Sequence, residues 1–91
     1  MAVVVIQEFE STLEDYEQVN EKLGDSAPAG LIVHTASDLG GGRWKVVDVW
    51  ESEGDFQKFV QERLIPAIAE VNPDAPQAEI QVHEVRDLMK P

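Results

Sequence analysis

A chain of 91 residues forms one domain with a thin core, because a chain of this size buries only about 60–65% of its unfolded surface. Its 18 acidic residues against seven lysines and arginines leave a net charge of −11, which disfavours nucleic acids and anionic membranes as partners. Cysteine is absent, which excludes disulfides and thiolate metal sites. The apolar run near the N-terminus is too short for a signal peptide or a membrane span, so a cytoplasmic protein is expected.

The first quarter of the chain predicts a strand and a helix. Residues 2–9 predict a central strand, because the continuous apolar run from Val3 to Ile6 indicates that both of its faces are covered. A Ser-x-x-Glu capping box at Ser11 then opens a helix that ends before Gly24. The residues of one helical stripe are Leu13, Tyr16, Val19, Asn20 and Leu23.

A hairpin and a long helix follow. Residues 30–38 and residues 43–50 alternate as strands do, and the three glycines between them predict a hairpin turn. Ser52 then caps a helix that reaches Val71, and Pro66 predicts a kink or a restarted turn within it. The expected buried stripe of this helix is Phe56, Phe59, Val60, Leu64, Ala67, Ile68 and Val71.

A last strand over residues 79–86 completes the order β-α-β-β-α-β. This order predicts a single ferredoxin-like α+β domain over residues 1–91, a four-stranded antiparallel sheet with two helices on one face. Two helices cover only one face of such a sheet, yet the first three strands carry apolar residues on both faces. The uncovered face therefore predicts a homodimer in which two sheets pack face to face.

The element order, the two-faced sheet and the junction Val49-Trp50-Glu51-Ser52 followed by Phe56 resemble the dimeric α/β-barrel superfamily. Within it, the chain is most similar to the antibiotic-biosynthesis-monooxygenase-type small proteins. The resemblance covers Val3 to Val85 in topology and implies a dimeric α/β barrel with a pocket between helices and sheet. Trp50 matches an aromatic residue that often lines this pocket.

The resemblance also implies a histidine about nine or ten residues after that aromatic in many of the monooxygenases and in the haem-degrading relatives. Phe59 and Val60 occupy those positions here, and residues 52–71 contain no histidine. This departure argues against haem ligation as in those relatives and weakens a monooxygenase assignment. The family places Trp50 on the helix side of the sheet, whereas periodicity alone permits either face.

A candidate site follows from the hairpin. If it closes symmetrically about Gly41, the opposed pairs are Asp38–Trp44, Ala36–Val46, His34–Asp48 and Ile32–Trp50. Directly opposed residues share a face and lie within about 5.5 Å at Cβ, so one face holds a histidine–aspartate pair flanked by two indoles. A register shift by an even number of residues keeps that face but separates the pair.

His34 and Asp48 are the predicted catalytic residues, a base and its orienting carboxylate, acting on a phenol or a carbon next to a carbonyl. Trp50, Trp44 and Tyr16 are the predicted substrate-binding residues. The predicted function is binding of an aromatic or polyketide-like molecule, with cofactor-free monooxygenase, isomerase or cyclase chemistry. The alternative is a non-catalytic dimeric module for a metabolite or a protein, in which His34 and Asp48 form an ordinary polar contact and both Trp44 and Tyr16 only pack.

Other chemistries lack the residues they need. His34 and His83 are the only histidines, and without a C-x-x-C motif they predict no zinc site. The triple glycine precedes a strand instead of a helix, which is wrong for a phosphate loop. Ser11 and Ser52 are helix caps, and neither lies in a nucleophile elbow. No metal and no cofactor is therefore predicted.

Overall fold

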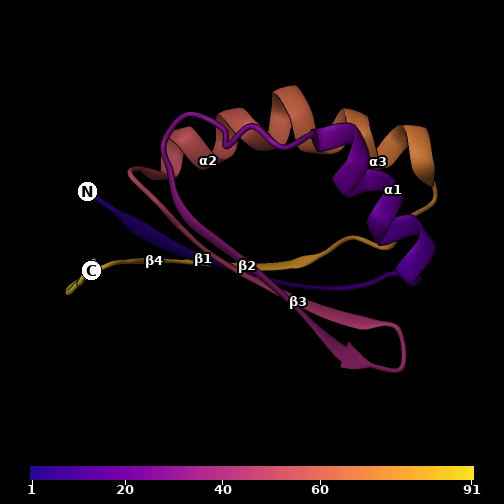
Figure 1. Cartoon of the computed structure of the whole chain (residues 1–91), viewed down its shortest axis with the longest axis horizontal. Coiled ribbons are helices and arrows are strands. Elements are labelled where there is room, and N and C mark those ends of the chain that lie inside the picture. The colour runs from indigo at the N-terminus through magenta and orange to yellow at the C-terminus, as the bar shows by residue number, and fades with distance from the viewer.

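Four antiparallel strands form one sheet in the order β2-β3-β1-β4 in the computed structural model, which describes residues 1–91. The strands are β1 (Val3–Glu10), β2 (Leu31–Gly40), β3 (Arg43–Trp50) and β4 (Glu79–Glu84). The helices are α1 (Leu13–Leu23) and a continuous segment made of α2 (Glu53–Phe59), the π-helical η1 (Val60–Leu64) and α3 (Ile65–Val71). All helices lie over one face of the sheet, which confirms the predicted ferredoxin-like α+β fold (Figure 1). None of them has the length and apolar character that crossing a membrane requires.

The β2–β3 hairpin has the register that the glycines predict. Gly41 and Gly42 have φ values of 62° and 81°, the left-handed conformation that a two-residue hairpin turn needs. Three predicted cross-strand pairs are present: Asp38–Trp44, Ala36–Val46 and His34–Asp48. The fourth is wrong, because an irregularity between Leu31 and Val33 places Leu31, and not Ile32, opposite Trp50.

Helix α1 begins one residue later than its sequence suggests. The Thr12 hydroxyl accepts a hydrogen bond from the Asp15 N–H at 3.1 Å, so Thr12 is the N-cap. Ser11 is not the cap because its N–H donates to the Gly42 carbonyl at 2.9 Å. This hydrogen bond continues the pairing of the strands by one residue, so the helix begins after Ser11. Gly24, with φ of 77°, ends the helix as predicted.

The second helical segment has the predicted cap, and a π-helical turn stands next to Pro66, where a kink or a restarted turn was predicted. The Ser52 hydroxyl accepts from the Asp55 N–H at 3.1 Å and donates to the Asp55 carboxylate at 2.9 Å. Ahead of Pro66 the helix widens, and the Ile65 N–H donates to the Val60 carbonyl five residues back. Because a proline ring clashes with the carbonyl four residues before it, the π-helical turn accommodates Pro66 without ending the helix.

The core is small, with only nine of the 91 residues buried. Val3, Val5, Trp50 and Phe56 form its main cluster. Trp50 therefore lies on the helix side of the sheet, the side that the family resemblance implies. Apolar residues on the opposite, uncovered face are Val4, Ile6, Val33, Val47 and Val49, of which none is buried.

The predicted helical stripes are not packed solid. Leu13, on the predicted stripe of α1, is 57% exposed, and α1 contains no buried residue at all. Of the long helix's stripe only Phe56 and Ala67 are buried. Most of the other stripe residues of both helices face a cavity between helices and sheet, namely Tyr16, Val19, Asn20, Leu23, Phe59, Val60, Leu64, Ile68 and Val71.

Candidate functional site

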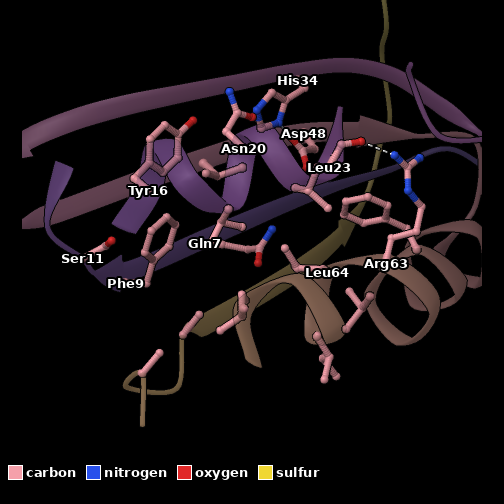
Figure 2. A pocket seen from close by; sticks show the side chains of 18 of the residues that line it. Gln7, Phe9, Ser11, Tyr16, Asn20, Leu23, His34, Asp48, Arg63 and Leu64 are labelled. Carbon is pink, nitrogen blue, oxygen red and sulfur yellow. Dashed lines mark hydrogen bonds and ion pairs between the residues drawn. The ribbon is translucent and has the colours of Figure 1, made fainter. Parts of the chain in front are cut away.

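A cavity of about 670 Å³ lies between the helices and the sheet, within the size range of small-molecule sites. The inward side chains of α1 and of the sheet line it, and α1 contains no buried residue. Its walls are mostly apolar: Phe9, Val46 and Trp50 come from the sheet, and Phe59, Leu64 and Ile68 from the long helical segment. Figure 2 shows the polar side chains that project among them.

His34 and Asp48 form the central polar pair of the cavity. They are opposed across β2 and β3, and the His34 Nδ1 lies 2.6 Å from the Asp48 Oδ1. The carboxylate is buried, with Asp48 4% exposed, whereas the His34 side chain is 46% exposed and has no second hydrogen-bond partner. The hydrogen bond to Asp48 raises the pKa of His34 above its ordinary value, and the aspartate charge adds to this against the opposing effect of burial. Asp48 thus orients the ring and leaves Nε2 free.

Tyr16 lines the cavity from α1 and is held by Trp44. The two rings stack with centroids 4.2 Å apart and 12° between their planes, and the Trp44 Nε1–H donates to the Ser11 carbonyl at 3.0 Å. Burial, and secondarily the charge of Asp48, raise the pKa of Tyr16, so its hydroxyl stays a neutral donor. Trp44 itself is buried and does not line the cavity, so its predicted place in the pocket wall is wrong: it supports Tyr16 from beneath.

Trp50 belongs to both the cavity wall and the core. It lines the cavity but is only 1% exposed, because it packs edge-on against Phe56 and tilted against Phe59, with centroids 5.8 Å and 5.4 Å away. Its Nε1–H is buried without a hydrogen-bond partner. Trp50 is therefore placed where the family resemblance implies, and it anchors the cavity to the core.

Several polar cavity residues were not singled out as site residues by sequence reasoning, among them Gln7, Asn20 and Arg63. Gln7 is only 8% exposed, yet its side-chain amide has no partner in the protein and points into the cavity (Figure 2). The sequence feature that could have identified Gln7 is its position on β1: it alternates with Val3 and Val5 on the inward face of the strand, where a polar residue is unusual. Asn20 lies one helical turn after Tyr16, on the predicted apolar stripe of α1.

No group of three or more histidine, cysteine, aspartate or glutamate side chains is placed to hold a metal ion. His34 is the cavity's single histidine, and Phe59 and Val60, which stand where haem-degrading relatives are expected to carry a ligand, present only apolar side chains. His83 lies on the edge strand β4, outside the cavity, with its Nε2 3.3 Å from the Gln81 side-chain oxygen.

Several solved structures share the architecture. SnoaB, a cofactor-independent oxygenase from Streptomyces nogalater, superposes with a TM-score of 0.71 at 16% identity over 97% of this chain and 96% of that chain. A candidate antibiotic biosynthesis monooxygenase from Deinococcus radiodurans gives 0.70 at 14% over the same shares. A mutant of MhuD, with two manganese protoporphyrin IX molecules bound per active site, gives 0.62 at 26% over 98% and 99%. No family model and no curated protein sequence matches the chain.

Proposed function

We propose that this chain, which has the antibiotic-biosynthesis-monooxygenase-type ferredoxin-like fold, binds an aromatic or polyketide-like molecule and removes a proton from it without a cofactor. The observation that carries the proposal is the cavity, which is hollow where a structural domain would be packed and which has His34 in its wall, oriented by a buried carboxylate. An unfilled cavity lowers the stability of a domain, so a cavity of this size beside a paired imidazole is better explained as a ligand-binding site than as part of the core.

The proposed chemistry begins at His34. In the neutral imidazole, the Nδ1–H donates to Asp48, so the lone pair of Nε2 is available as a base. A phenol, or a carbon next to a carbonyl, gives up its proton to Nε2, and Asp48 stabilises the imidazolium that forms. The Tyr16 hydroxyl is a donor for the negative oxygen that develops on the substrate. Oxygenase, isomerase and cyclase reactions of aromatic substrates can all start from such an anion.

The test is deuterium exchange at the acidic position of a bound ligand. A panel of naphthols and of tricyclic ketones with an acidic CH₂ is titrated into the protein by calorimetry, and exchange of the CH₂ in D₂O is followed by NMR. We expect binding and accelerated exchange, and a loss of about 10²- to 10⁴-fold in the exchange rate for His34→Ala. His83→Gln, which changes the histidine outside the cavity, is the matched control and should exchange at the native rate.

The outcomes separate the two candidate functions. Binding without accelerated exchange indicates the alternative, a non-catalytic module that holds a metabolite. Exchange that survives His34→Ala unchanged removes the base assignment. A cavity that binds none of the panel contradicts the proposed ligand class.

We also propose that the chain is a homodimer through the sheet face that the helices leave open. The face presents Val4, Ile6, Val33, Val47 and Val49, an apolar patch large for a chain with so few buried residues. Covering it with the same face of a second copy removes both patches from water at once. Light scattering at micromolar concentration should give twice the chain mass of 10.1 kDa, and a strictly monomeric mass would contradict the proposal.

A further inference from the structure

Arg63 is the only lysine or arginine among the residues that line the cavity. The chain has 18 acidic residues against seven lysines and arginines, so an arginine here has many possible carboxylate partners. Nevertheless Arg63 lies within ion-pair distance of none, whereas Lys22 pairs with Glu70, and Arg43 lies near two glutamates. Lys45, Lys58, Arg86 and Lys90 have no ion pair either, but Arg63 is the one unpaired cation that lines the cavity, where an anionic group of a ligand can reach it.

The Arg63 side chain is fixed at one end of the cavity. Its Nη2 donates to the carbonyl of Leu23, the last residue of α1, and its guanidinium carbon lies 5.7 Å from the centroid of the Phe59 ring (Figure 2). The π-helical turn η1 places Arg63 there, and such turns occur often at functional sites. A guanidinium has five N–H donors, so this one contact to Leu23 leaves most of the fork available.

Arg63 carries the fixed positive charge of the cavity wall. Figure 2 shows it beside Leu23 and away from Tyr16. The acidic residues of the lining are Glu10, Asp15, Asp25 and Asp48, and none of them lies within ion-pair distance of Arg63. A negative group of a ligand is therefore attracted to the end of the cavity where Arg63 lies.

Gln7 supplies a second, independent observation. The residue is only 8% exposed, and its side-chain amide forms no hydrogen bond within the protein and points into the cavity, so the amide is available to a polar group of a ligand (Figure 2). The cavity thus offers a charged fork at one end, an amide on the floor and apolar walls between them.

We infer that the ligand of this cavity is an aromatic carboxylate whose carboxylate group pairs with Arg63 and whose ring system lies over Gln7 beneath His34. The inference rests on the proposed function and adds the substrate class. Its rival is a purely structural arginine, one that only caps α1 through Leu23 and covers Phe59.

The experiment compares two ligands of nearly equal shape, 2-naphthoate and the neutral 2-naphthamide, by calorimetry. Native protein should bind the carboxylate more tightly than the amide by about tenfold to a hundredfold, the range for a hydrogen-bonded charge. Arg63→Gln should remove that preference and leave the affinity for the amide unchanged. Lys22→Gln removes the same charge outside the cavity and should keep the preference. Arg63→Lys keeps the charge but lacks the planar, bidentate guanidinium donors, so it should retain only part of the preference for the carboxylate.

Each result decides between the readings. Equal binding of both ligands by native protein overturns the inference but leaves the proposed function standing. An equal loss of affinity for both ligands in Arg63→Gln shows a structural arginine and also overturns it. Failure of native protein to bind either ligand or any of the phenol and ketone panel contradicts the proposed function itself. If Arg63→Gln does not fold, Arg63→Lys and the salt dependence of the native preference decide, because only a charge pair weakens in salt.

Discussion

Replacing Asp48 with asparagine is expected to lower the pKa of His34 toward the ordinary histidine value of about 6.5. In the native chain, the hydrogen bond that the His34 ring donates to Asp48 is the largest cause of the raised pKa of His34, and the charge of Asp48 contributes further. Asparagine keeps the size of the side chain and removes the charge, so the cavity keeps its shape. The measurement is an NMR titration of the His34 imidazole, with the signals of His83 as the reference in the same spectra.

The same substitution should move the pH profile of proton exchange. The neutral imidazole is the active form, so the native rate should rise with pH through the native pKa of His34, which lies above 6.5. In Asp48→Asn the rise should occur at lower pH, and the plateau should be lower because no carboxylate stabilises the imidazolium. Asp74→Asn, in an exposed loop outside the cavity, should leave the native profile. A profile that does not shift in Asp48→Asn would mean that another group is the base.

Stability should respond in the direction that linkage requires. Because the pKa of His34 is raised in the folded state, the protonated form stabilises the fold; this contribution is complete below about pH 6.5 and is lost as pH rises through the native pKa. The urea midpoint of native protein should therefore be higher near about pH 5.5 than near about pH 8.5, and the difference should shrink in Asp48→Asn. An undiminished difference would show that the pair does not cause the pH dependence.

The pairing of His34 with Asp48 was predictable because a short hairpin has few registers. Closing the hairpin about Gly41 brings the two residues opposite each other, and the structure reaches this register through a two-residue turn at Gly41-Gly42 and an irregularity between Asp38 and Gly40. The prediction fails farther from the turn, where an irregularity at Ile32 changes the partner of Trp50. The predicted N-cap of α1 was wrong for a related reason. The Ser11 N–H donates to the carbonyl of Gly42, which is distant in sequence, and a local capping pattern cannot predict such a tertiary contact.

The cavity was harder to predict than the fold. Hydrophobic periodicity marks which residues face inward, but the same pattern arises whether the inward space is filled or hollow. Trp44 was therefore assigned to the pocket, although its ring is stacked under that of Tyr16. Leu13 follows the helical periodicity of the α1 stripe, but its side chain is exposed to solvent. The sequence signals for Gln7 and Arg63 were weak. Gln7 is a polar residue at an inward strand position, and Arg63 is a cation next to an apolar helical stripe. Both patterns indicate a site only when a cavity is known to lie between the helices and the sheet.

Replacing Trp50 with alanine is expected to cost about 3–5 kcal/mol, the range for truncating a buried aromatic. Trp50 is the largest fully buried side chain and a member of a core cluster of only four residues. A domain of this kind has a total stability of about 5–15 kcal/mol, so Trp50→Ala should lose much of it. The midpoint of urea unfolding, followed by circular dichroism, measures the change.

Trp50→Phe should cost much less than Trp50→Ala, although it also removes apolar area. The native Nε1–H is buried without a partner, which costs about 1–3 kcal/mol, and phenylalanine has no such group. The deletion of this donor offsets part of the lost packing against Phe56 and Phe59. If Trp50→Phe is as destabilising as Trp50→Ala, the indole N–H has an acceptor in solution, and a molecule bound in the cavity is where that acceptor must be sought.

The phenylalanine variant also separates the two roles of Trp50 when it is compared with Phe56→Leu. Phe56 is as deeply buried as Trp50 but does not line the cavity. Phe56→Leu should therefore lower stability by about 1 kcal/mol and leave ligand affinity unchanged. Trp50→Phe should keep most of the stability and weaken the binding of polycyclic ligands, because the smaller ring supports Phe59 in the cavity wall less firmly. Equal affinities in the two variants would place the ligand away from Trp50, toward the helical wall of the cavity.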